Sequence, residues 1–302
     1  MYKILSAGAA LVAIVSVPAQ AYEVAGGELS FNVGTRYSSV SNIAFLQGGG
    51  VTADGDNSFA INAGAGFERT FGQNGRLSLS YGWTSTRYDA QGSRDNELQS
   101  AAAVYTHRVG IATLGVSHAQ AWYDLDGSSF LQVSSSSAFL GAPGPLGSVL
   151  VGRYSHSETE LEGGFAFRDA QTDTFGLTAQ RQFGATTLQI GVSAAEEDAV
   201  AVELDHDSRT LTASLSQPVL VLAQPLLVSL SGSYAERDYD AINPVIGMAR
   251  EDEHTRLALS VSRSFADGLT LSASVSDLAA TSNLPAADYD QSVVSVGVSM
   301  NF

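Results

Sequence analysis

Gln291-Ser-Val-Val-Ser-Val-Gly-Val-Ser-Met-Asn-Phe302, the last twelve residues of the chain, decide the fold. Apolar side chains occupy every second position of this stretch: Val294, Val296, Val298, Met300 and Phe302. Such strict alternation is typical of a strand with one face on lipid and the other on a polar interior. A soluble sandwich would avoid so apolar an edge, because it invites aggregation. The stretch predicts the closing strand of a transmembrane β-barrel, with Val296, Val298, Met300 and Phe302 as its barrel assembly signal.

The same period of two recurs along most of the chain. Apolar residues make up 44% of the sequence but are dispersed, Gly is abundant at 30 residues, and Pro is scarce at 7. Pro fits poorly in a closed hydrogen-bonded sheet, and no apolar run is long enough for a helical span. We therefore expect one all-β domain, an antiparallel up-and-down barrel of fourteen strands, or of twelve if 148–168 is a single loop. The expected strands are residues 28–39, 58–71, 76–88, 97–108, 111–123, 148–157, 160–168, 172–182, 186–195, 208–216, 226–237, 254–265, 269–280 and the final stretch.

The expected connections mostly alternate in length, as periplasmic turns and external loops do in outer-membrane barrels. An even number of strands would place both termini in the periplasm. The connection at 169–171 breaks the pattern, because it is short where a long one is due. The Ser-rich segment 124–147 is the longest loop and could plug the lumen, and two Pro predict a turn over 218–225. Short connections are expected at 72–75, 109–110, 183–185 and 266–268, and long ones at 40–57, 124–147, 196–207, 238–253 and 281–290.

The first residues have the pattern of a cleaved secretory signal. A basic start at Lys3 is followed by an apolar run from Ile4 to Val17, and then by Ala19-Gln20-Ala21. That order of a charged region, an apolar region and an A-x-A site is the pattern of a signal peptide. We expect residues 1–21 to be removed and residues 22–302 to form the barrel in the outer membrane of a Gram-negative cell.

Charge and cysteine content limit the possible partners and the possible ways of stabilising the fold. The net charge of −16 argues against nucleic acid, whose binding needs a basic face. There is no Cys, so disulfides are not expected to stabilise the fold. Carboxylates concentrate in the expected loops, where they could keep the exposed end soluble or meet lipopolysaccharide phosphates through divalent cations. The expected partners are outer-membrane lipid, lipopolysaccharide and the barrel assembly machinery.

Candidate catalytic residues are few. Asp205-His206-Asp207 lies in an expected external loop, and a carboxylate beside His can activate water. The triplet has no partner in the sequence, so a solvated acidic loop is the simpler interpretation. His156 and Ser157 are adjacent on an expected strand and would point to opposite faces, which excludes a catalytic pair. Asp124, Asp126 and Gly127 do not continue into a calcium loop. We predict a protein that is not an enzyme, with no cofactor and no metal.

Several short motifs resemble a known group of barrels. Ser41-Asn42-Ile43 follows the first expected strand, and Ser282-Asn283-Leu284 leads through Asp288-Tyr289-Asp290 into the last. Arg237-Asp238 precedes the last external hairpins, and Leu125-Asp126-Gly127 follows the fifth expected strand. The layout resembles the C-terminal barrel of the surface lipoprotein assembly modifier family and related β-barrel porins, over most of residues 28–302. The resemblance implies a fourteen-strand pore that helps lipoproteins reach the cell surface after a periplasmic helical-repeat domain. Because only residues 22–27 precede the first strand, that role would need a separate periplasmic partner or lipoprotein client.

The sequence thus predicts an outer-membrane channel, either a solute pore or a translocation channel. If it is a solute pore, the acidic loops are expected to give it a mild preference for cations. A surface lipoprotein assembly or export barrel is the first alternative. A hydrolase with its site at the barrel rim, at Asp205, His206 or Asp207, is the second.

Overall fold

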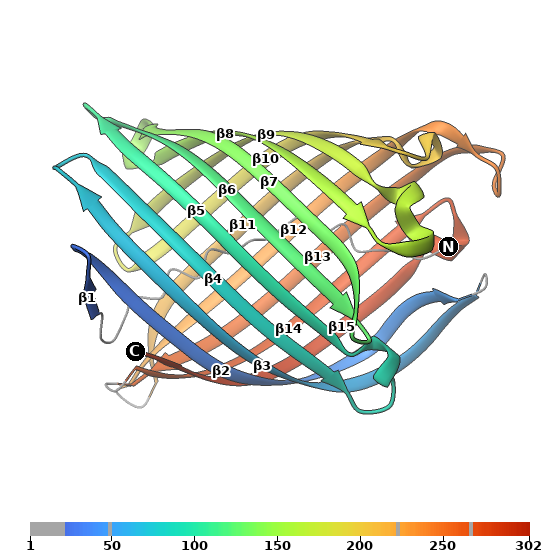
Figure 1. Ribbon diagram of the computed structural model, residues 1–302, viewed down its shortest axis with the longest axis horizontal. Coiled ribbons are helices and arrows are strands. Elements are labelled where there is room, and N and C mark those ends of the chain that lie inside the picture. Colours follow the sequence, from blue (N-terminus) through green and yellow to red (C-terminus); the bar gives the residue numbers. More distant parts are fainter. Residues whose placement is uncertain (1–21, 48–49, 222–223, 266–267) are drawn as a thin grey trace.

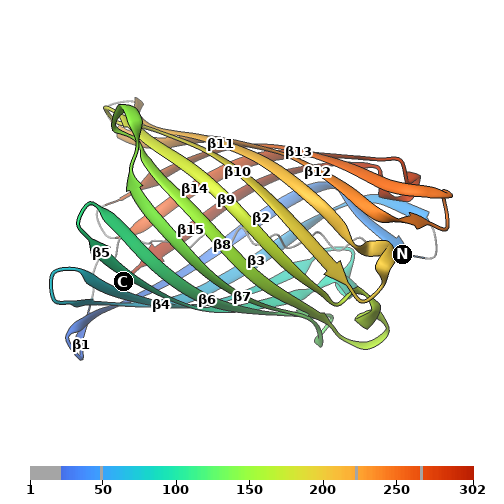
Figure 2. The same ribbon diagram turned by 90° about the horizontal axis from the view of Figure 1, so that it is seen from above.

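The chain closes into a single antiparallel barrel. The computed structural model describes residues 22–47, 50–221, 224–265 and 268–302. Each strand from β2 to β15 pairs with its neighbours in the chain, and β2 also pairs with β15, so that the sheet has no free edge. The ring therefore has fourteen strands, and the three-residue strand β1 pairs with β2 outside it. Figure 1 and Figure 2 show the strands steeply inclined to the barrel axis. The predicted fold and strand number are confirmed.

The strands are long, and short 3₁₀ helices lie in several connections. The strands are β1 (Tyr22–Val24), β2 (Gly27–Gln47), β3 (Gly50–Phe71), β4 (Gly75–Tyr88), β5 (Asn96–Val109), β6 (Ala112–Leu125), β7 (Ser128–Pro143), β8 (Val149–Leu161), β9 (Ala170–Phe183), β10 (Thr186–Ala199), β11 (His206–Val221), β12 (Gln224–Asn243), β13 (Met248–Ser264), β14 (Leu269–Ser282) and β15 (Tyr289–Asn301). The 3₁₀ helices are η1 (Gly92–Arg94), η2 (Pro145–Gly147), η3 (Gly163–Arg168), η4 (Val202–Leu204) and η5 (Pro285–Ala287). Among the described residues, no helix is long and apolar enough to cross a membrane.

The two ends of the barrel differ. At one end, here the turn end, the connections include 72–74, 110–111 and 184–185, and the chain finishes there. Gly110 and Gly184 take φ of +61° in these tight turns, a conformation that a residue with a Cβ adopts only under strain. At the other end, here the loop end, η1, η3, η4 and η5 lie in longer connections. Figure 1 shows the turn end on the left and the loop end on the right.

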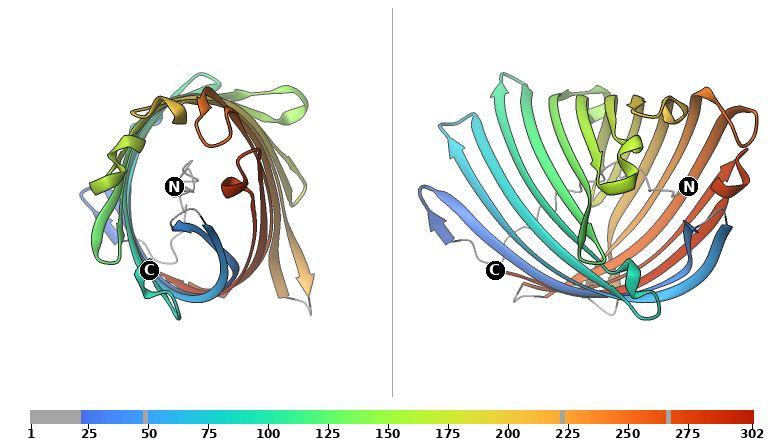
Figure 3. Two further views of the ribbon diagram at one scale, coloured as in Figure 1. Left: turned by 90° about the vertical axis from the view of Figure 1, so that its right-hand side faces the viewer. Right: turned by 45° about the vertical axis from the view of Figure 1, so that its right-hand side comes forward.

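Residues of each strand alternate between lipid and lumen. Val296 pairs with Tyr37 and Ala273, and all three share a face with the exposed apolar side chains of the neighbouring strands. The next position, Gly297, pairs with Arg36 and Ser272 on the opposite face. Large apolar side chains stand outward around the ring, and small polar ones line the inside, as in an outer-membrane barrel. Figure 3 shows the barrel end-on, with the strands forming a closed wall.

One predicted loop is a strand, and one predicted strand is wrong. Residues 124–147, expected to be a loop that plugs the lumen, contain β7, which pairs with β6 and β8 as part of the wall. Asp126 and Gly127, with φ of 51° and 74°, make the turn before it. The Ser-rich composition hid the alternation of this strand. Residues 160–168, expected to be a strand, are the end of β8 and the helix η3. The two errors offset each other, which is why the strand count still held.

Other expected loops are extensions of paired strands. The segment 40–57 continues the β2–β3 pair as far as Gln47 and Gly50. In the same way, much of 196–207 and 238–253 lies in paired strands. The connection from β8 to β9 spans 162–169 at the loop end, so the anomaly at 169–171 disappears. The expected turn over 218–225 is also too wide, because β11 runs through Pro218 to Val221 and β12 starts at Gln224.

Candidate functional site

The lumen wall consists largely of small polar side chains. Hydroxyl groups on neighbouring strands bond to one another across it, at 2.9 Å between Ser38 and Ser295 and at 2.6 Å between Ser117 and Ser137. These short side chains take up little of the barrel's interior, and they can exchange hydrogen bonds with water. The wall is therefore a wettable surface without an apolar seal at these positions.

Arginines project from this wall. Arg36 on β2 shares the lumen face with Gly297, and Arg256 on β13 shares it with Ser233. Arg153 on β8 donates to the Ser137 hydroxyl from Nε at 3.1 Å and from Nη2 at 2.8 Å. Within the described part of the chain, no carboxylate forms an ion pair with Arg36, Arg153 or Arg256. Their charges are thus free to act on solutes in the lumen.

The barrel separates its charges by face, although the whole chain is acidic. Among the strand residues whose side chains the structure describes, lumen-facing arginines outnumber lumen-facing carboxylates. The register places Arg36, Arg76, Arg108, Arg153, Arg237, Arg250 and Arg256 inside, together with Glu28, Asp56, Glu68, Glu197 and Asp252. The net charge of −16 is therefore not the charge of the lumen.

Many of the carboxylates face outward instead. One cross-strand row runs over five neighbouring strands and consists only of carboxylates: Asp173, Glu196, Asp207, Asp238 and Glu251. Like charges that face each other across a ladder repel. This row lies on the loop-end side of the outward apolar residues Phe175 and Val192. The row is therefore farther from the turn end than these apolar side chains are.

Inside the loop end, polar side chains pack into a buried cluster against the wall. Tyr239 and Asp252 are both buried, and the tyrosine hydroxyl donates to Oδ2 of Asp252 at 3.4 Å. Arg250 donates from Nε to Oδ1 of the same carboxylate at 2.9 Å, and its guanidinium lies 4.6 Å from the centre of the Tyr239 ring. The His206 ring also stacks on Tyr239, at 4.9 Å between centroids. The cluster lies on the inner side of β11 to β13.

Helix η3 brings Arg168 to this cluster. Burial lowers the pKa of the Arg168 guanidinium, and the nearby charge of Arg250 acts in the same direction. Tyr239 and Glu197 oppose that effect, so the arginine stays a cation held beside acidic groups. The mouth therefore contains several arginines whose charges its own carboxylates balance in part.

The structure divides the predicted rim triplet between three environments. Asp205 accepts a hydrogen bond from the backbone N–H of Ala199 at 2.7 Å, which closes the loop around η4. His206 points inward and is buried, with Nδ1 3.1 Å from the carbonyl oxygen of Leu204. Asp207 faces outward opposite Glu196. Adjacent strand residues point to opposite faces, so these three side chains do not converge on one point.

The structure also shows which face of the barrel the other residues considered from the sequence occupy. His156 faces outward and bonds to Oδ1 of Asp173 at 3.0 Å, whereas Ser157 faces the lumen and donates to the Thr172 carbonyl. The assembly-signal residues Val296, Val298, Met300 and Phe302 all lie on the lipid face of β15 or directly after it. Sequence reasoning points to Arg256 as a residue that could line a constriction, whereas it does not single out Arg36 and Arg153. Their signal was available, because each occupies a polar position of an alternating strand.

Comparison with known proteins gives the fold and no closer relation. No family model matches the chain, and no curated protein matches it. Among solved structures, CdiB from Acinetobacter baumannii superimposes with a TM-score of 0.53 at 14% identity, over 91% of this chain and 60% of that one. An anion-selective porin from Comamonas acidovorans gives 0.53 at 11% identity, over 91% and 99%. A loop-deletion mutant of OmpT, an outer membrane protein of Vibrio cholerae, gives 0.55 at 10% identity, over 92% and 100%. The chain has the fold of outer-membrane β-barrels, and it spans less than two thirds of CdiB.

Proposed function

We propose that the protein is an outer-membrane pore for small solutes that prefers anions. The observation that carries the proposal is the set of lumen arginines, Arg36, Arg153 and Arg256, that no described carboxylate neutralises. A fixed charge inside a low-dielectric wall raises the local concentration of counter-ions. The small hydroxyl side chains between the arginines supply the wettable path. The acidic sequence led us to expect a preference for cations. We propose a preference for anions instead, because the carboxylate row faces outward and not into the lumen.

Geometry separates the two sets of charges. At physiological ionic strength the Debye length is about 8 Å, so charges on the outside of the wall act weakly on ions along the lumen axis. The lumen arginines face the aqueous path directly, with no part of the wall between them and the ions that pass. The likeness to an anion-selective porin agrees with this preference, although at 11% identity it speaks for the fold alone.

The proposal includes an orientation. We infer that residues 1–21 are cleaved, that the turn end and both termini lie in the periplasm, and that the loop end faces outward from the cell. The carboxylate row would then lie at the level of lipopolysaccharide headgroups. The chain would reach this state through the barrel assembly machinery, with β15 as the recognised strand.

The alternative from the sequence is an assembly or export barrel with a separate periplasmic partner. Likeness to CdiB fits either function, because that chain is much longer and the match concerns the barrel fold. No observation in the described residues favours the rim hydrolase, since Asp205 and His206 are engaged in structural contacts.

Solute flux distinguishes the pore from the alternative. The mature chain, residues 22–302, would be refolded into liposomes, and swelling would be followed in isotonic arabinose, a small uncharged sugar. We expect swelling at a rate that rises with protein content. Folded protein that gives no swelling would contradict the pore and favour the export role.

A further inference from the structure

The outward face of β6, β7 and β8 carries polar side chains at a depth where other strands carry apolar ones. His118 is the seventh residue after the turn at 110–111. The seventh residues after the equivalent turns before β4, β10, β12 and β14 are Tyr81, Val192, Leu230 and Val275. All four are exposed on the lipid face. His118 is thus a polar exception in an apolar band.

The exception extends over three strands. His118 pairs with Ser136, and Ser136 pairs with His156. Two positions farther along, Gln120 pairs with Ser134. His118 and Gln120 follow the lipid-facing Val116 by two and four residues, and His156 follows the lipid-facing Tyr154 by two. Ser134 and Ser136 are their cross-strand partners, so all five belong to the outward face. We call His118, Gln120, Ser134, Ser136 and His156 the polar patch.

Depth excludes lipid headgroups as partners for the middle of the patch. Seven residues rise about 23 Å along a strand. A tilt of 35–45° reduces this to about 17 Å along the barrel axis, inside an apolar band about 25 Å tall. Phosphate and ester groups lie at the edges of the hydrocarbon, so at the level of His118 only acyl chains would meet it. Acyl chains offer no hydrogen bonds, and exposing polar groups to them is costly.

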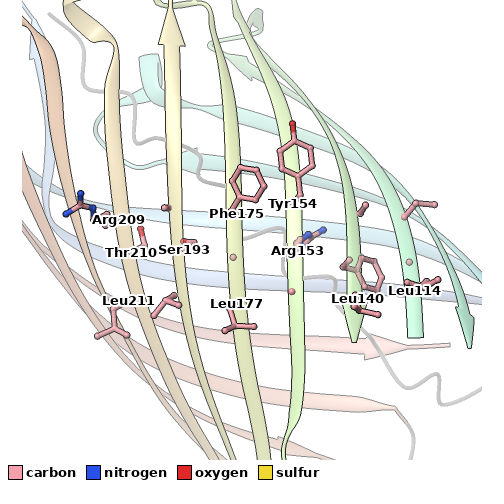
Figure 4. Close-up of a pocket in the computed structure, with 18 of the residues that line it drawn as sticks. Leu114, Leu140, Arg153, Tyr154, Phe175, Leu177, Ser193, Arg209, Thr210 and Leu211 are labelled. Atoms are coloured by element: carbon pink, nitrogen blue, oxygen red, sulfur yellow. The ribbon is translucent and has the colours of Figure 1, made fainter. Parts of the chain in front are cut away.

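An apolar groove adjoins the patch on its turn-end side. It is a concavity of about 1250 Å³ on the outside of the wall, lined by residues of β5 to β12. Figure 4 shows Leu140, Tyr154, Phe175 and Leu177 along it. Gly152 pairs with both Leu140 and Leu177, and its lack of a side chain leaves the outer surface low between them. Small residues at such a place let another protein surface approach closely in a membrane.

We propose that this face is the interface between two copies of the chain, related by a two-fold axis along the membrane normal. Imidazole, hydroxyl and amide groups each donate and accept hydrogen bonds. The polar patch of one protomer can therefore form hydrogen bonds with the same patch of a second protomer. Within a protomer, His118 bonds through Nδ1 to Ser136 at 3.0 Å, which uses one of its two ring nitrogens. The other ring nitrogen is available to the copy. The leucine and aromatic side chains that border the groove of one protomer would enter the groove of the second protomer.

The face supplies most of the area that a standard interface needs. Five adjacent strands, β6 to β10, at about 4.8 Å spacing across a band of about 25 Å present about 600 Å². A standard protein interface buries about 800 Å² on each partner. The loop-end extensions of the same strands can supply the remainder.

Because the chain contains no Cys, single cysteines give a direct test. Ser136→Cys places a thiol within the proposed interface. Ala273→Cys is the matched control, outward on β14 at the far side of the ring, between Leu271 and Val275. Outer membranes carrying each variant would be oxidised with copper phenanthroline and run on denaturing gels. We expect a disulfide-linked homodimer from S136C, at least tenfold above the control.

Three results would overturn the proposal. The first is no homodimer above control, which would mean that lipid covers the face. The second is a linked product of another mass, which would mean a different membrane protein. The third is a trimer by light scattering in nanodiscs without an S136C link, which would contradict a two-fold axis. A second variant, His118→Leu with His156→Leu, replaces the two imidazoles of the patch with apolar side chains that suit lipid. We expect it to remain folded and to become monomeric by light scattering, and a double variant that stays dimeric would also contradict the proposal.

Discussion

Arg153 on β8 reaches back to Ser137 on β7, donating to its hydroxyl from Nε at 3.1 Å and from Nη2 at 2.8 Å. The same guanidinium also donates to Ser117 on β6 at 3.3 Å. Hydroxyl partners fix the position of the side chain without neutralising it, so that a full positive charge lies on the lumen wall. This arrangement links the serine-rich strands to the proposed preference for anions.

Arg153→Gln should reduce the preference for anions. Glutamine can still donate to Ser137 and carries no charge. We expect the anion-to-cation permeability ratio to fall by about twofold, the order of effect of one fixed charge in a narrow aqueous path. Arg181→Gln is the control, because Arg181 faces outward beside Phe183. Reversal potentials in a salt gradient measure both, and equal changes in the two variants would count against a lumen role for Arg153.

His206 should be structural. Its ring is buried against Tyr239, and His206→Ala would leave a cavity beside buried polar groups. We expect a loss of about 1–3 kcal/mol in the free energy of unfolding. Asp207→Asn should change it by less than about 0.5 kcal/mol, because Asp207 only faces Glu196 and Asp238 outside the wall. Urea unfolding in detergent micelles measures both, and a His206 variant as stable as the parent would contradict the described packing.

Gly115 should tolerate no side chain. A Cβ there would lie 2.0 Å from the ring of Phe139, whereas at Gly176 the nearest atom would be 3.7 Å away. Gly115→Ala should therefore cost about 1–3 kcal/mol by overpacking, and Gly176→Ala should be close to neutral. Urea unfolding of both variants under one set of conditions gives the comparison. Equal midpoints would show that Phe139 moves aside freely.

The orientation predicts which ends are accessible. Gly164→Cys in η3 should react with a membrane-impermeant maleimide in intact cells, because the loop end faces outward. Ala185→Cys, in the turn between β9 and β10, should react only after the outer membrane is permeabilised. The reverse labelling pattern would show that the barrel is inserted the other way.

The closing contact predicts an assembly defect. Phe302 and Phe31 exchange two backbone hydrogen bonds, at 2.8 and 3.1 Å, where the last residue meets the first strand of the ring. Removing Phe302 takes away both bonds and the terminal aromatic side chain. We expect less folded barrel in outer membranes, measured by heat-modifiable migration on gels. Val293→Ala, on the lumen face of β15, is the control and should assemble normally.

Period-two alternation was enough to predict most of the wall, because the lipid face imposes it on strands such as β15. It failed at β7, where Ser134 and Ser136 occupy outward positions that usually hold apolar residues. The polar patch and the misread strand thus have one cause. A surface that is covered by protein is free of the constraint that makes a membrane strand recognisable.

The site was harder to predict than the fold. Sequence position gives the face of each residue only once the register is known, and the register sends His206 inward and Asp207 outward. The same register sorts the carboxylates from the lumen arginines, which a net charge cannot do. The buried contact between Tyr239 and Asp252 joins two strands through a bulge after Asp238, and no pattern in the sequence marks it.

The reversal potential of single channels formed by residues 22–302 tests the central claim most directly. The protein would be inserted into a neutral planar bilayer between potassium chloride solutions of different concentration. The account predicts steady openings whose reversal potential has the sign of chloride selectivity, with a smaller value for Arg153→Gln. Openings with the sign of potassium selectivity, unchanged by Arg153→Gln, would contradict it.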